Sequence, residues 1–141
     1  MAITQYAGSP FRKFTSLAWP VNVLKRRVLS AAFQPDCRAT ACFYGTGIHN
    51  GKLGRDADAG SLQRAGEMRG PLLLVWGSQD PHIPAEGRAK VEETLRAKGR
   101  TFSVRHYPAE HAFMRDEGPR FDPEAADQAF ADAVAFYRSV F

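Results

Sequence analysis

Residues 71–80 read Pro-Leu-Leu-Leu-Val-Trp-Gly-Ser-Gln-Asp, and this stretch decides the fold class. The continuous apolar run from Leu72 to Trp76 is typical of a parallel strand that is covered on both faces. Gly77 permits a tight exit from that strand, and Pro81 stiffens the next segment. We therefore predict a buried strand over residues 71–76 that ends in a rigid turn carrying Asp80.

Helical and extended patterns alternate on both sides of this strand. The predicted elements are short helices over 27–33 and 61–67, strands over 39–44, 71–76 and 102–107, and longer helices over 85–98 and 124–139. Strands that alternate with helices imply right-handed crossovers and a parallel sheet. Residues 1–23 show no sustained period, so we expect a loop there, or a strand or short helix only where the fold offers a partner. The fold class is α/β, a parallel sheet with flanking helices.

Composition and charge limit the kinds of partner that the chain is expected to bind. The 141 residues are 44% hydrophobic and 24% charged, close to the average of one globular domain. The net charge of +4 arises in residues 1–38, which alone carry +5. Without a basic face interleaved with aromatic residues we predict no nucleic-acid partner, and without an apolar run of roughly 18 residues no membrane partner. Two cysteines and the lack of a secretory signal pattern favour a cytoplasmic location.

Two residues that could share a proton lie just past successive predicted strands. Asp80 comes just after the strand over 71–76, and His111 lies four residues past the strand over 102–107. Ligands gather at the carboxyl ends of the strands of an open parallel sheet. An acid that orients a histidine, and a histidine that moves a proton, form the acid–base half of a nucleophile–His–acid triad. The order acid before histidine, with the nucleophile earlier, is that of the α/β-hydrolases.

Four motifs carry a resemblance to a known family. They are Ala41-Cys-Phe-Tyr-Gly-Thr-Gly-Ile48, the stretch over 71–80, His106-Tyr-Pro108 with His111-Ala-Phe113 after it, and Phe121-Asp-Pro-Glu-Ala-Ala126. Together they resemble the C-terminal half of a dienelactone hydrolase. The resemblance implies a partial α/β-hydrolase fold over residues 27–141 and activity on a small lactone or carboxylic ester. It also implies that Asp80 and His111 are the acid and the base of the triad.

Residues 1–26 depart from that family's pattern. The family carries a nucleophile in a Gly-x-Cys-x-Gly-Gly elbow just before the helix that starts here near Arg27, and the resemblance would place Val23 at the nucleophile's position. Valine has no lone pair with which to attack, so we predict no nucleophile and little turnover. A truncated or frame-shifted gene would produce this pattern, which is our hypothesis for the segment. The alternative is a non-catalytic α/β module that docks on a partner or self-associates through an unpaired sheet edge at residues 39–44.

Other chemistries fit the sequence less well. His82, His106 and Glu110 could be grouped with Asp80 and His111 as a metal site, but no H-E-x-x-H or C-x-x-C spacing supports one. No phosphate-binding Gly-Lys-Ser/Thr motif is present. We therefore predict neither a metal nor a cofactor.

Overall fold

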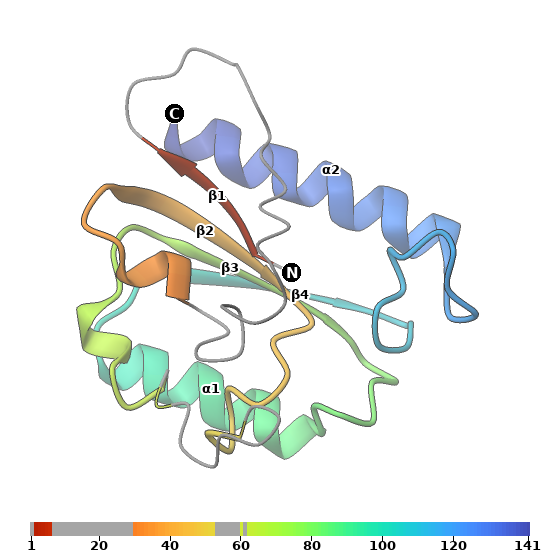
Figure 1. The fold of residues 1–141 in the computed structure, drawn as a ribbon, viewed down its shortest axis with the longest axis horizontal. Helices are drawn as coiled ribbons and strands as arrows, with labels where there is room; N and C mark the ends of the chain where they lie inside the picture. The colour runs from red at the N-terminus through yellow and green to blue at the C-terminus, as the bar shows by residue number, and fades with distance from the viewer. Residues whose placement is uncertain (1, 7–29, 53–59, 61) are drawn as a thin grey trace.

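A computed structural model describes residues 2–6, 30–52, 60 and 62–141. Its centre is a four-stranded sheet in the order β1-β2-β3-β4. The strands are β1 (Ala2–Tyr6), β2 (Cys37–Phe43), β3 (Leu72–Gly77) and β4 (Phe102–Tyr107). Helix α1 (Ala85–Ala97) lies on one face of the sheet and helix α2 (Pro123–Val140) on the other (Figure 1). Two short 3-10 helices, η2 (Ser30–Phe33) and η3 (Ala65–Glu67), complete the described elements.

The predicted parallel sheet is confirmed. Strand β2 pairs with β3 in parallel, with Thr40 opposite Leu72, and β3 pairs with β4 in parallel, with Trp76 opposite His106. The two long helices also lie where the periodicity places them. Of the predicted helix over 27–33, the described residues form the short helix η2, and residues 27–29 lie outside the described part. Of the predicted helix over 61–67, the described residues form only η3.

The prediction of an unpaired edge at residues 39–44 is wrong. Strand β1 pairs with β2 antiparallel on that side, with Ala2 opposite Cys42 and Gln5 opposite Ala39. The open edge of β2 presents backbone N–H and C=O groups that need partners, and any extended segment within reach can supply them. A strand of five residues therefore forms where the sequence has no strong period of its own.

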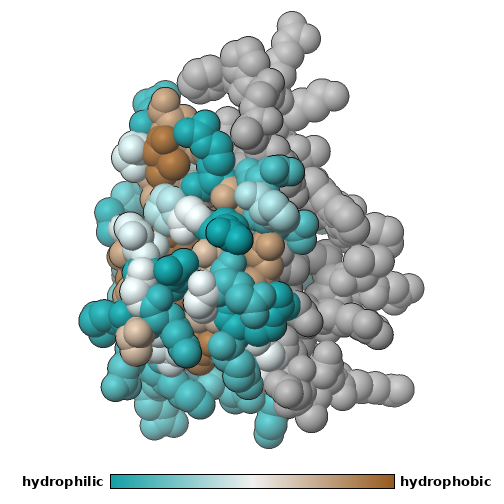
Figure 2. All heavy atoms as spheres, turned by 90° about the vertical axis from the view of Figure 1, so that its left-hand side faces the viewer, coloured by the Kyte–Doolittle hydropathy of each residue, from teal (hydrophilic) through white to brown (hydrophobic). Residues whose placement is uncertain are grey.

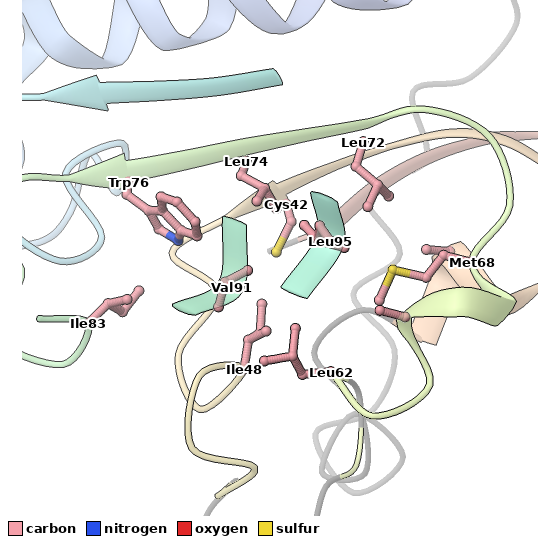
Figure 3. Packing of buried hydrophobic residues seen from close by; sticks show 12 residues of the cluster. Cys42, Ile48, Leu62, Met68, Leu72, Leu74, Trp76, Ile83, Val91 and Leu95 are labelled. Carbon is pink, nitrogen blue, oxygen red and sulfur yellow. The ribbon is translucent and has the colours of Figure 1, made fainter. Parts of the chain in front are cut away.

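The core has two layers, one on each face of the sheet. Successive side chains of a strand point to opposite faces of the sheet. Because all six residues of β3 are buried, both faces of this strand are covered. Leu72, Leu74 and Trp76 face the α1 side, where they meet Val91 and Leu95 (Figure 3). The other layer faces α2, whose Ala125, Ala129 and Ala133 recur every fourth residue and let the helix approach closely. The described helices include none that is both long and apolar enough to span a bilayer.

The two candidate residues lie at the same end of the parallel strands. The carboxyl ends of β3 and β4 lead into the loops that carry Asp80 and His111. Figure 2 views the opposite end of the sheet, where the described surface is mostly hydrophilic and apolar side chains appear only in small groups. The candidate site therefore lies at the edge of the sheet where ligands of parallel sheets usually bind.

Candidate active site

Asp80 is held rigidly just past the end of β3. The residue is 3% exposed, and its backbone N–H donates to the carbonyl oxygen of Gly77 at 3.3 Å. One carboxylate oxygen, Oδ1, accepts the backbone N–H of His82 at 2.8 Å. A buried carboxylate is costly unless its oxygens are engaged, and this turn satisfies one of them within the loop itself.

His111 engages the second oxygen. Its Nδ1 atom lies 2.6 Å from Asp80 Oδ2, and its side chain is 22% exposed whereas that of Asp80 is fully buried. The structure thus brings together the two residues that the sequence singled out, although 31 positions separate them. An imidazole whose Nδ1–H is held by a carboxylate keeps the lone pair of its other nitrogen, Nε2, for accepting a proton. This geometry would allow a proton to be transferred through the partly exposed histidine.

Gly77 makes the close approach of the two loops possible. A Cβ atom at this position would overlap the carbonyl oxygen of Ala109 and lie 2.7 Å from that of Glu110. Across the same gap the N–H of Ser78 donates to the Tyr107 carbonyl at 2.7 Å. The N–H of Gln79 donates to the Ala109 carbonyl at 3.1 Å. The segment before His111 is therefore tied to the segment before Asp80 by backbone contacts.

Two aromatic rings flank His111. The sequence analysis considered His82 only as a metal ligand and gave Tyr44 no role at the site. The ring of His82 meets that of His111 edge-on, with the centroids 4.9 Å apart. The ring of Tyr44, which comes directly after β2, lies 5.5 Å from His111 by the same measure. The sequence feature that could have placed Tyr44 at the site is its position at the carboxyl end of the strand next to β3, just before Gly45. His82 could be found only from its spacing of two residues from Asp80.

The two cysteines do not lie at this site. Val23, which we expect at the family's nucleophile position, falls outside the described residues. Cys37 begins β2 and so lies at the amino end of the parallel strands, where its Sγ atom is 3.1 Å from Thr40 Oγ1. Cys42 is buried in the core, and this burial raises the pKa of its thiol to about 11.

The histidines do not gather into one cluster. His106 points to the α1 side of β4, where its ring lies 5.7 Å from that of Trp76 and its Nε2 is 3.9 Å from Glu92. Burial and the nearby Arg88 lower the pKa of His106. Within the described ranges, no three His, Cys, Asp or Glu side chains are grouped so that they could hold a metal ion.

Known proteins are similar in sequence to parts of this chain. A Saccharomyces cerevisiae protein assigned as a carboxymethylenebutenolidase is 36% identical over 80 residues, which cover 54% of this chain and 29% of that protein. An Azospirillum brasilense protein assigned as a carboxymethylenebutenolidase is 28% identical over 114 residues, which cover 81% of this chain and 45% of that protein. The chain thus spans less than half the length of each.

The fold comparison agrees. A solved structure assigned as a dienelactone hydrolase from Klebsiella pneumoniae superposes with a TM-score of 0.69 at 26% identity, over 77% of this chain and 45% of that chain. The α/β-hydrolase fold expected from the resemblance is thereby confirmed. A sequence model described as the dienelactone hydrolase family matches residues 26–141. With this match over most of its length, the chain belongs to the dienelactone hydrolase family.

Proposed function

We propose that this chain carries the acid–base half of a hydrolase site for carboxylic esters or lactones. The observation that supports the proposal most directly is the 2.6 Å contact between His111 Nδ1 and the buried carboxylate of Asp80. The carboxylate holds the imidazole in one tautomer and stabilises the imidazolium that forms when Nε2 accepts a proton. Family membership and the assigned names of the relatives point to the same bond type.

The proposed chemistry has two proton transfers. Nε2 of His111 takes the proton of a thiol or hydroxyl as that group attacks the carbonyl carbon of the ester. The same nitrogen then gives the proton to the leaving alkoxide, and an acyl intermediate remains on the nucleophile until water releases it. The carboxylate of Asp80 stabilises the positive charge that the ring carries between the two transfers.

The nucleophile is the part that this chain does not supply at the family's position. Aligning the family's helix with the one expected near Arg27 would put Val23 there, and its side chain has neither an acidic proton to give nor a lone pair to attack with. The proposal therefore includes an impaired activity, because a general base without a nucleophile acts only weakly toward water. The loss of the elbow's oxyanion donors removes a further factor of about 10²–10³ in rate.

The alternative function is a non-catalytic module that docks on a partner or self-associates. Residues 39–44 do not offer it an open edge, because β1 occupies that edge. The outer described strand on the other side, β4, carries exposed Ser103 and Arg105. A charged side chain on an edge strand disfavours pairing with a further chain.

The experiment compares hydrolysis of p-nitrophenyl acetate by the chain and by its His111→Ala variant. We expect equal rates, because the chain has no nucleophile for His111 to activate. Replacing residues 1–26 by a family-like strand with a Gly-x-Cys-x-Gly-Gly elbow should restore turnover that His111→Ala abolishes. His106→Ala in the same chimera is the matched control, since it removes an exposed histidine outside the pair, and it should leave turnover unchanged.

Two results would contradict the proposal. A chimera whose turnover survives His111→Ala would show that this histidine is not the base. A burst of acyl-enzyme from the unaltered chain, abolished by Cys37→Ala or Ser30→Ala, would show that another nucleophile has been recruited.

A further inference from the structure

Backbone strain is concentrated on either side of the Asp80–His111 pair. Among the described residues, the non-glycine positions with left-handed backbone are Tyr44, at φ 54°, and Ala112, at φ 62°. Residues with a Cβ atom rarely adopt this conformation, and it persists where surrounding contacts enforce it. Ala112 comes directly after His111, and Tyr44 packs against the His111 ring. The two unfavourable positions therefore meet at the candidate histidine.

Tyr44 is linked to the turn that carries His111 by three contacts. Its phenol oxygen accepts the backbone N–H of Met114 at 2.8 Å, across 70 positions of the chain. Its ring lies 5.5 Å from that of His111 and 5.2 Å, edge-on, from that of Phe113. Since Phe113 is fully buried, the far end of this contact is fixed in the core.

The His111 loop is thus anchored on both sides. Before the histidine, the Ala109 carbonyl accepts the N–H of Gln79 from the loop after β3. After the histidine, the Met114 N–H is held by Tyr44 from the end of β2. The first anchor is made by backbone atoms alone. The second is made by a side-chain oxygen, which can be removed without changing the length of the chain. The Phe113 carbonyl beside it accepts the Asp122 N–H at 2.9 Å, and this backbone bond would remain.

Proton transfer by Tyr44 itself is not part of this arrangement. Burial raises the pKa of the phenol to about 12, so it remains neutral near pH 7. Its oxygen accepts from a backbone amide instead of a titrating group. The residue is suited to holding the turn in place.

We propose that Tyr44 is a positioning residue for His111, and that its hydrogen bond to Met114 keeps the imidazole Nδ1 on Asp80. A catalytic consequence of this role rests on the proposed hydrolase function. The placement of the His111 ring does not rest on that function, and it can be measured without any substrate. Failure of the one proposal is therefore distinguishable from failure of the other.

The test uses nuclear magnetic resonance on the full chain and two variants. Tyr44→Phe removes the phenol oxygen and keeps the ring. Tyr137→Phe is the matched control, because the Tyr137 oxygen also accepts a backbone N–H, that of Ala41 at 3.1 Å, away from the His111 loop. The readouts are the amide exchange rate of Met114, the Nδ1–H resonance of His111 and the titration midpoint of His111.

Tyr44→Phe should speed the amide exchange of Met114 about 2- to 10-fold, the range expected when one hydrogen bond is lost. It should also broaden or abolish the His111 Nδ1–H resonance and shift the midpoint. Tyr137→Phe should leave all three readouts as in the unaltered chain. The proposal is overturned if Tyr44→Phe leaves the His111 signals unchanged, or if Tyr137→Phe alters them equally, since the effect would then be one of general stability.

Discussion

Replacing Gly77 with alanine tests whether backbone contact between two loops builds the Asp80–His111 pair. The new Cβ atom would overlap the carbonyl oxygen of Ala109 and lie 2.7 Å from that of Glu110. Both obstacles are backbone atoms, so rotating a side chain cannot relieve the clash. The segment that leads into His111 would have to move away from β3.

The size of the effect depends on the contacts that such a movement breaks. The hydrogen bonds from Ser78 to Tyr107, at 2.7 Å, and from Gln79 to Ala109, at 3.1 Å, cross the same gap. Each is worth about 0.5–1.5 kcal/mol net, and overpacking in a filled site costs about 1–3 kcal/mol. We expect Gly77→Ala to lower the free energy of unfolding by about 2–6 kcal/mol, a large share of the stability of an ordinary domain.

The assay is urea unfolding monitored by circular dichroism, with Gly66→Ala as the matched control. A Cβ atom at Gly66, in the short helix η3, would find only the Lys98 side chain, at 4.0 Å. That substitution should change the free energy of unfolding by about 0.5 kcal/mol or less. Equal stability of the two variants would refute the reasoning. So would a Gly77→Ala chain in which the Nδ1–H resonance of His111 is unchanged.

Three further predictions concern the core and the helix that covers it. Phe113→Ala, at a fully buried ring, should cost about 3–5 kcal/mol in urea unfolding, whereas Phe130→Ala, at a ring that is 56% exposed, should cost about 0.5 kcal/mol or less. Asp122→Ala removes the carboxylate that caps α2 and should cost about 0.5–2 kcal/mol, and the exposed Asp127 on the same helix supplies the control, Asp127→Ala. The raised pKa of Cys42 means that the folded chain keeps a proton that the unfolded chain loses, so the free energy of unfolding should fall as the pH rises from about 9 toward 11. Cys42→Ala should flatten that fall, and an equally steep fall in the variant would count against the assignment.

The candidate pair was within reach of the sequence because the relevant signals are local. Asp80 and His111 each come after a short apolar or alternating strand, and parallel strands deliver their carboxyl ends to the same edge of a sheet. The periodicity of the helix over Pro123–Val140 is likewise local, since its buried alanines repeat every fourth residue. Where the spacing of apolar residues is strong, one sequence suffices to place the element.

Contacts between distant segments left no comparable signal. In the sequence, Tyr44 is an ordinary residue at the end of a predicted strand. Only the folded chain shows that its phenol oxygen accepts the backbone N–H of Met114. The five residues of β1 have no period of their own, and the free edge of β2 decides their conformation. Residues 1–38 are basic and contain prolines, but neither feature predicts which strand the segment pairs with.

The sequence alone therefore determined the α/β class, the parallel order of the strands after residue 37 and the two residues of the pair, because hydrophobic periodicity and turn residues act over a few positions. Only the tertiary structure decided that Gly77 lets two loops touch, that Tyr44 anchors the histidine turn and that β1 covers the sheet edge. Each of these depends on atoms that are far apart along the chain, and their meeting is set by the packing of the whole sheet and its helices.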